Sequence, residues 1–168
     1  MPSPNRWGLI VRKPRELHGD SRVIILDFNT VIQQFSEKKS GDVFTTNPHI
    51  DAFVRAYPEK AKFFMGWCRV SVDLIDKKIV WHEFYPLGGI NAFHKKGLGS
   101  LVQAIIVQKL KRRFPGSKII SGTIEDRSRL DQLKNMGIKP KEWYSIESYY
   151  AKTRDYLKGV YKRHPRPK

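Results

Sequence analysis

The sequence has 168 residues, of which 32 are lysine or arginine and 16 are aspartate or glutamate, and its formal net charge is +16. A domain of this size buries about 70% of the surface that its unfolded chain exposes, so it forms a core without metal or disulfides, which excludes a disulfide-stapled miniprotein. Its longest apolar runs, such as Val23–Leu26, are far shorter than the ~20 residues of a membrane span. With one cysteine and no apolar leader-like stretch at the start, we expect a cytoplasmic protein with no membrane partner.

Positive charge is concentrated towards both ends of the chain. The last seventeen residues hold seven lysines and arginines against one acid, Asp155. Such a field attracts polyanions, and we expect nucleic acid as partner, RNA rather than DNA, because no helix-turn-helix or zinc-finger pattern is present. A solvated lysine-rich surface and an acidic protein partner are the alternatives. The sequence predicts a basic arm over residues 1–20, one domain over 21–161 and a basic disordered tail over 162–168.

The first half of the domain predicts a strand followed by two helices. β-Branched residues over 22–28 indicate the strand, and Asn29-Thr30 is expected to cap a first helix that ends before Ser40-Gly41. Asn47-Pro48 begins a second helix, which Pro58 interrupts or ends.

An antiparallel hairpin is predicted next. Residues 64–74 alternate with period two, so that Cys68, Val70 and Val72 share one face and polar residues occupy the other. A polar turn then leads to a return strand that reaches at least Tyr85.

Two glycines precede a strongly helical stretch. Gly97 and Gly99 lie at the start of a helix that is predicted to run to Arg113. Glycines at a helix N-terminus let unpaired N–H groups and the positive end of the helix dipole approach a phosphate, whereas the alternative is a tight turn that merely needs positive φ. A strand predicted over 118–124 follows the helix, and this strand–loop–helix–strand order favours a phosphate-binding loop. Its residues are His94, Lys95, Lys96, Gly97, Leu98, Gly99 and Ser100.

This loop resembles that of the GNAT acyltransferase superfamily, whose acyl-CoA pyrophosphate loop has the pattern Gln/Arg-x-x-Gly-x-Gly/Ala at the start of the central helix. The resemblance continues in the helix after the next strand, where the family pattern is Asn-x-x-Ala-x-x-x-Tyr-x-x-x-Gly-Phe. The residues at the matching positions are Asp126, Arg129, Leu133, Gly137 and Ile138.

The resemblance covers roughly residues 60–140, and the predicted element order β–α–α–β–β–β–α–β–α of the whole chain is also similar to that of the family. It implies an α/β (α+β) fold with a mixed, mostly antiparallel central sheet flanked by helices. It also implies acetyl-CoA or another acyl-CoA as the cofactor, and acyl transfer from the thioester to an amine.

Two positions depart from the family or leave its alignment open. Leu133 stands where many members have the tyrosine that protonates the departing CoA thiolate, and leucine has no proton to donate. Before the loop, either the strand continues through a bulge at Pro86 to Gly88-Gly89, or it ends at Tyr85. The glycine pair favours the first interpretation, since in the family the backbone of this strand holds the pantetheine arm.

Glu83 is the candidate general base, because an amine must lose a proton before or during attack on a thioester. It alternates along its strand with Trp81 and Tyr85, so it is expected beside aromatic surface that raises a carboxylate pKa. The alternative role is a cross-strand partner of a lysine or arginine.

Tyr144 is the candidate acid in place of the missing tyrosine, and Tyr149 and Tyr150 are further candidates; core or surface packing is the alternative for all three. Cys68 lacks any neighbouring activating residue in the sequence. The five histidines show no ligand spacing, so no metal site is expected.

A basic surface is predicted on the central and C-terminal helices, where aromatic rings alternate with charges in a manner that suits RNA. Its residues are Lys109, Lys111, Arg112, Arg113, Lys152, Arg154, Lys158, Lys162 and Arg163. Two hypotheses therefore stand side by side. The first is an acyl-CoA-dependent N-acyltransferase acting on a nucleic-acid-linked or nucleic-acid-bound acceptor. The second is a catalytically inactive GNAT-like module that binds nucleic acid or a ribonucleoprotein.

Overall fold

The computed structural model describes residues 3–88, 97–122, 124 and 126–163, with 161–163 described by their backbone alone. Within them, the strands are β1 (Trp7–Val11), β2 (Arg15–His18), β3 (Val23–Gln34), β4 (Val43–Thr45), β5 (Gly66–Asp73), β6 (Lys78–Tyr85), β7 (Lys118–Ser121) and β8 (Trp143–Ser145). The helices are α1 (Pro48–Ala56), α2 (Pro58–Lys62), α3 (Leu98–Arg113), α4 (Arg127–Met136) and α5 (Ile146–Arg163), with a short 3-10 turn at Phe35–Glu37.

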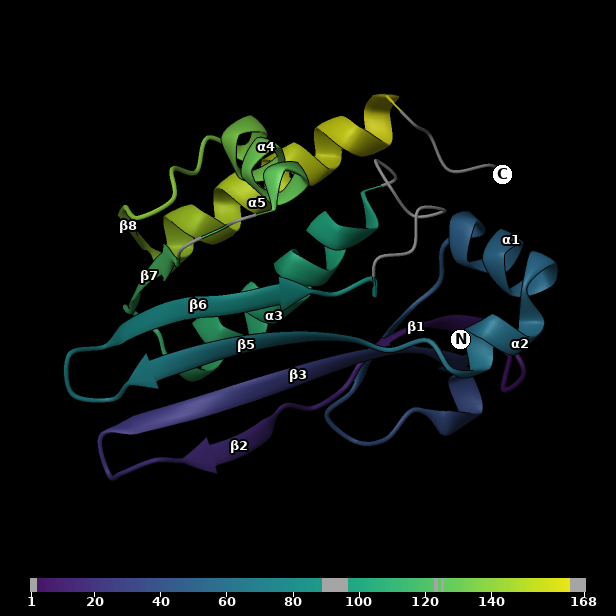
Figure 1. Ribbon diagram of the computed structural model, residues 1–168, viewed down its shortest axis with the longest axis horizontal. Coiled ribbons are helices and arrows are strands. Elements are labelled where there is room, and N and C mark those ends of the chain that lie inside the picture. Colours follow the sequence, from purple (N-terminus) through teal and green to yellow (C-terminus); the bar gives the residue numbers. More distant parts are fainter. Residues whose placement is uncertain (1–2, 89–96, 123, 125, 164–168) are drawn as a thin grey trace.

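One open sheet holds all these strands, in the order β4-β1-β3-β5-β6-β7-β8, with β2 paired to β3. Its neighbours are antiparallel except for β6 and β7, which run parallel and are connected through α3. Figure 1 shows α4 and α5 together near β6 and β7, with α1 and α2 at the end of the sheet where β5 begins. The expected α/β fold with a mixed, mostly antiparallel sheet flanked by helices is therefore confirmed.

The predicted helix after Asn29-Thr30 is wrong, because β3 continues through this point to Gln34. Every second residue from Ile24 to Ile32 is buried, as a strand with one covered face requires. Thr30 lies within that buried row and donates its hydroxyl to the Pro86 carbonyl, so it does not cap a helix. Continuous pairing of β3 with β5 outweighs the local capping signal.

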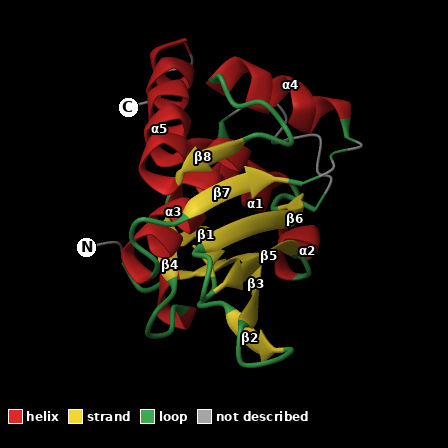
Figure 2. Ribbon diagram, turned by 90° about the vertical axis from the view of Figure 1, so that its left-hand side faces the viewer, coloured by secondary structure: helices red, strands yellow, loops and turns green. Residues whose placement is uncertain are grey.

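Residues 7–18 do not form the expected N-terminal arm. They form β1 and β2, and β1 lies inside the sheet between β4 and β3 with Leu9, Ile10 and Val11 fully buried. Figure 2 shows β2 at the end of the sheet far from α4 and α5. At the other terminus, α5 extends to Arg163 and so includes the first two residues of the expected tail, whose remaining residues lie outside the described part.

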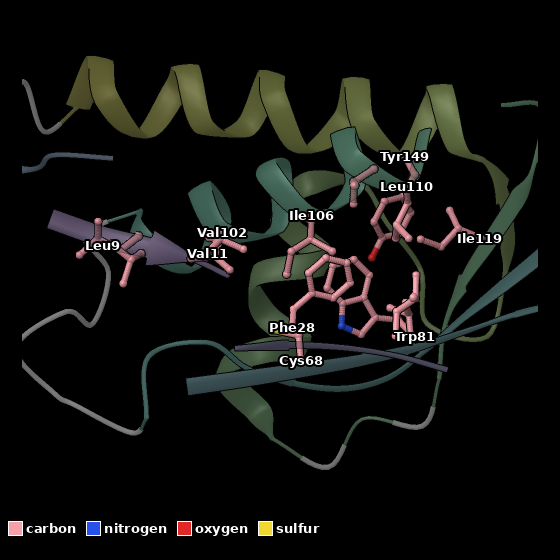
Figure 3. Close-up of a cluster of buried hydrophobic side chains, with 14 of the residues drawn as sticks. Leu9, Val11, Phe28, Cys68, Trp81, Val102, Ile106, Leu110, Ile119 and Tyr149 are labelled. Atoms are coloured by element: carbon pink, nitrogen blue, oxygen red, sulfur yellow. The ribbon is translucent and has the colours of Figure 1, made fainter. Parts of the chain in front are cut away.

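The predicted hairpin is confirmed as β5 and β6. Cys68, Val70 and Val72 are buried, and the residues between them are at least partly exposed on the opposite surface of the sheet, which we call the open face. In Figure 3, side chains of β3, β5 and β6 meet Val102, Ile106 and Leu110 of α3, with Tyr149 of α5 beside them. This core fixes α3 and α5 against the same strands that carry the candidate site.

Candidate functional site

β7 pairs in parallel with only the first half of β6. Its register runs from Lys78 opposite Lys118 to Trp81 opposite Ser121, and Gly122 then donates its N–H to the Trp81 carbonyl at 3.0 Å. A Cβ at Gly122 would lie 2.9 Å from that carbonyl oxygen, so glycine permits the close approach. Beyond this point β6 continues to Tyr85 without β7 beside it.

A cleft of about 140 Å³ lies where the strands separate. Its lining consists of Trp81, His82, Phe84, Ser121, Gly122, Ile124, Asp126 and Arg129. The walls thus come from β6, from β7 with the residues after it, and from the start of α4. Aromatic rings and a guanidinium share one small opening, which is suited to a ligand with both apolar and charged parts.

A β-bulge at His82 turns β6 at the cleft. Trp81 is opposite Val70 while Glu83 is opposite Arg69, so His82 is an extra residue in the ladder. Trp81 is buried, whereas Glu83 is exposed on the open face, where its carboxylate accepts a hydrogen bond from Trp67 Nε1 at 2.8 Å. The expected alternation of Glu83 with Trp81 is therefore wrong, since a bulge changes the side on which the following residues lie.

Glu83 nevertheless lies beside aromatic surface, formed by Trp67 and Tyr85, whose ring centroids are 5.0 Å apart. It does not line the cleft, but His82, next to it in sequence, does. The candidate base thus faces the open side of the sheet, next in sequence to a cleft residue but outside the cleft lining.

β6 ends at Tyr85, so the second of the two interpretations of this stretch describes the structure. After Tyr85 the chain passes over the start of β5, where the Pro86 carbonyl accepts from Thr30. A Cβ at Gly66 would lie 2.1 Å from the Pro86 oxygen, so glycine is required beneath this crossing.

The two glycines of the predicted phosphate loop differ in whether the fold requires glycine at their positions. Gly97 is the N-cap of α3 with φ +79°, and a Cβ there would lie 2.8 Å from Val160 Cγ1, so the fold itself requires glycine. Gly99 has no positive φ, and a Cβ would lie 3.4 Å from Gln132 Nε2 and 3.9 Å from Leu87 Cδ1. An alanine therefore fits at Gly99, where glycine costs the helix up to about 1 kcal/mol.

The fold also uses the side chains of two other residues of the predicted phosphate loop. The side chains of Leu98 and Ser100 are buried, and Ser100 Oγ accepts from Gln132 Nε2 at 2.8 Å, so only their backbone N–H groups remain for a ligand. No side chain of the described residues caps α3, whereas the Asp126 carboxylate caps α4 by accepting from Ser128 N at 2.8 Å. His94, Lys95 and Lys96 lie outside the described residues.

Arg129 is the cleft residue that sequence reasoning missed. Its side chain lies in the first turn of α4 and is 8% exposed, with the guanidinium 3.9 Å from the Phe84 ring centroid and 5.8 Å from that of Trp81. Nη1 donates to Gln132 Oε1 at 3.0 Å and also to Gln103 Oε1. A signal was present in the sequence, because the charged Arg129 shares the i, i+4, i+7 face of α4 with Leu133 and Met136, which are both buried.

Burial dominates the electrostatics of Arg129 and lowers its pKa. No carboxylate of the described residues forms an ion pair with it. Asp126 raises its pKa only as a minor contribution, and the Asp126 carboxylate is engaged with the N–H groups of α4. The cleft therefore contains a buried positive charge whose hydrogen-bond partners within the described residues are neutral.

Tyr149, rather than Tyr144, approaches the cleft. Its fully buried hydroxyl lies 2.8 Å from the Oγ of the cleft residue Ser121, and burial raises the pKa of Tyr149. The Tyr144 hydroxyl accepts from Lys139 N at 2.8 Å and donates to Glu142, so it stabilises the loop before β8.

Two further side chains are buried in the core and have no catalytic role. Leu133 is fully buried and contributes no proton. Burial raises the pKa of the Cys68 thiol, which stays protonated, so this cysteine is not a nucleophile.

Part of the predicted basic surface gathers around Tyr150 of α5. Lys111 Nζ lies 4.9 Å from its ring centroid and Arg154 Cζ lies 5.7 Å from it, so α3 and α5 present two cations together. Neither forms an ion pair with an acid among the described residues. We call Lys111, Tyr150 and Arg154 the basic cluster; Lys158 is exposed one turn further along α5.

Other members of the predicted surface lie elsewhere. Lys109 donates to the Gly41 carbonyl at 2.7 Å, Arg113 pairs with Glu16 of β2, and Lys152 lies beside the Tyr144 ring. Arg112 is exposed on α3. The side chains of Lys162 and Arg163 lie outside the description.

No protein-family model, curated protein or solved structure matches this chain. Within the described residues, no helix combines the length and apolar character needed to cross a membrane. Nor do three or more His, Cys, Asp or Glu side chains in that part of the chain group in a way that would hold a metal ion.

Proposed function

We propose that the protein is an acyl-CoA-dependent N-acyltransferase whose acceptor amine is linked to, or bound on, nucleic acid. Gly99 carries this proposal. It is a glycine inside a helix where the protein leaves room for alanine, at the N-terminus of α3, which no side chain of the described residues caps. A ligand phosphate on those N–H groups accounts for the glycine, because a Cβ would lie where the phosphate approaches.

The cleft beside α3 supports the same ligand. Gln132 links the two features, since its Nε2 lies 3.4 Å from the Cβ position of Gly99 and its Oε1 accepts from Arg129. A thioester anchored by its pyrophosphate at α3 therefore reaches the separated strands, where the backbone of β6 beyond Trp81 is not paired with β7.

In the proposed reaction the acceptor nitrogen attacks the thioester carbonyl carbon, a C–N bond forms and the C–S bond breaks. The amine loses one proton, for which Glu83 on the open face is the candidate base. The departing CoA thiolate takes up one proton, for which the hydroxyl pair Ser121 and Tyr149 at the cleft is the candidate source in place of Leu133. Together these transfers yield an amide and CoA thiol.

The basic cluster supports a nucleic-acid-linked acceptor, preferably RNA. Two cations held against one ring, neither of them in an ion pair within the described residues, present positive charge that attracts phosphates and makes binding salt-dependent. Charge reversal by Lys111→Glu with Arg154→Glu should lower RNA affinity and reduce the slope of log affinity against log salt by about 0.7 for each phosphate that is no longer neutralised. The matched control is Lys60→Glu with Lys62→Glu on α2, at the other end of the sheet. Unchanged RNA binding by the Lys111→Glu, Arg154→Glu double variant would contradict the proposal that the acceptor is linked to nucleic acid.

A second candidate function is favoured by one observation, the burial of Leu133 at the position where the family donates a proton. In this alternative the protein binds nucleic acid without catalysing acyl transfer. It predicts salt-dependent RNA binding together with no binding of CoA thioesters.

Calorimetric titration with acetyl-CoA tests the proposed function, using nuclease-treated protein. Gly99→Glu adds a negative charge at the start of α3, which stabilises the helix dipole but repels a pyrophosphate. We expect it to abolish acetyl-CoA binding without loss of thermal stability, while Gly99→Gln, of equal size and no charge, weakens binding less. Equal binding by all three proteins would contradict the proposed site.

A further inference from the structure

Arg129 is a buried cation for which the described residues provide no ion-pair partner. Burying an unpaired charge costs several kcal/mol, so buried charges in proteins are paired or meet a charged ligand. By contrast, the partly exposed Arg69 makes two hydrogen bonds to the Asp27 carboxylate at 2.6 and 2.8 Å. The hydrogen-bonding side chains around the Arg129 guanidinium, among the described residues, are Gln103, Gln132 and the Tyr149 hydroxyl.

The guanidinium is held in place before any ligand arrives. Phe84 and Trp81 lie against it, and two glutamine oxygens accept from Nη1. Ordering of this kind lowers the entropy cost of binding, and the planar guanidinium matches the geometry of a carboxylate.

The cleft has room for a small group. Its volume of about 140 Å³ accommodates a short chain that ends in a carboxylate. The Asp126 carboxylate at the rim repels an anion, so the negative group is directed to Arg129 and away from the start of α4.

We propose that Arg129 binds the free carboxylate of a dicarboxylic acyl group, so that the preferred donor is a short carboxyacyl-CoA thioester rather than a neutral acyl-CoA. This inference rests on the proposed function. The CoA thiolate that leaves in the reaction explains the buried charge of Arg129 less well. It forms only after the C–S bond breaks, whereas the carboxylate of the acyl group compensates the charge of Arg129 as soon as the thioester binds. For the thiolate, Ser121 and Tyr149 already provide hydroxyl groups at the cleft.

The experiment compares two thioesters of equal chain length, succinyl-CoA and butyryl-CoA, by calorimetry on the full chain. The wild type should bind succinyl-CoA about tenfold or more tightly than butyryl-CoA, as a charge-assisted hydrogen bond requires. Arg129→Met should remove this preference while butyryl-CoA still binds, and Arg129→Lys should retain part of it.

A second variant keeps the experiment decisive if Arg129→Met does not fold. Gln132→Glu has nearly the same shape and places a carboxylate next to Arg129 Nη1, so the protein then supplies its own counter-ion. It should fold, lower the affinity for both thioesters through added negative charge, and lose the preference for succinyl-CoA.

The outcomes separate the inference from the function on which it rests. Binding of both thioesters with equal affinity would overturn the inference and leave the proposed function standing. A preference for CoA over desulfo-CoA at high pH, without a preference for succinyl-CoA, would assign Arg129 to the thiolate and also overturn it. Absence of binding by any CoA compound would overturn the proposed function itself.

Discussion

The residues at the two ends of β6 differ in their roles, which are stability at one end and ligand binding at the other. In the paired end, from Lys78 to Trp81, hydrogen bonds to β7 and packing against the helices account for the side chains. In the separated end and the helix starts beside it, the contacts among the described residues leave two features unexplained. These are the glycine at position 99 and the buried charge of Arg129, which has no ion-pair partner in that part of the chain. Substitutions at the paired end should therefore change stability, and those at the separated end should change ligand binding.

The largest expected effect lies at the paired end. Ile79 is fully buried beside Ile119, so Ile79→Ala should lower the free energy of unfolding by about 2–5 kcal/mol through weaker apolar packing and a new cavity. Urea unfolding measures this change. At temperatures where the variant stays folded, its acetyl-CoA affinity should equal that of the wild type. A loss of affinity in the folded variant would contradict the distinction between the two ends of β6.

Gly97→Ala should destabilise the protein by about 1–2 kcal/mol or more, because alanine disfavours the left-handed region and its Cβ meets Val160. Thermal unfolding of Gly97→Ala beside Gly99→Ala tests whether the two glycines differ in role. Gly99→Ala should be neutral or slightly stabilising. Equal destabilisation at both positions would show that the fold needs Gly99 as well.

Asp126→Ala should lower stability by about 1 kcal/mol, because the carboxylate caps α4 through Ser128 N and Arg129 N. Asp126→Asn keeps the cap and should retain that stability in urea unfolding. If the two variants were equally unstable, the charge at the cleft rim rather than the cap would be the stabilising element.

The smallest effect is expected at Arg69, which forms an ion pair with Asp27, whereas Arg129 forms none with the described residues. Hydrogen bonds from Arg69 lower the pKa of Asp27, so this pair stabilises the protein above the ordinary aspartate pKa, and the contribution is lost as the pH falls through the lowered value. Because both side chains are partly exposed, the contribution should be below about 1 kcal/mol. Unfolding of wild type and Asp27→Asn from pH 6 to 2 measures it; a constant difference over this range would contradict the assignment.

Sequence patterns predicted the elements whose periodicity is local. The alternation of Cys68, Val70 and Val72 identified β5, and the glycine pair with the apolar stripe after it located α3. The full length of β3 was missed because Asn29-Thr30 carries a capping signal that only pairing with β5 overrides.

The candidate site was predicted only in part, for a related reason. The bulge at His82 depends on the register of two strands, and the burial of Arg129 depends on Phe84, Gln103 and Gln132 meeting from three elements. Neither arrangement is encoded within a short stretch of sequence. Gly99 was identified, but its distinction from Gly97 required the positions of Val160 and Gln132.

The central claim is that the start of α3 beside the separated strands is a CoA site, and calorimetry with acetyl-CoA on wild type, Gly99→Glu and Gly19→Glu tests it most directly. Gly19 is the matched control because a side chain there meets open space and its φ is not positive. We predict micromolar binding by the wild type and by Gly19→Glu, and no binding by Gly99→Glu at unchanged thermal stability. No heat of binding from the wild type at millimolar acetyl-CoA would contradict the account.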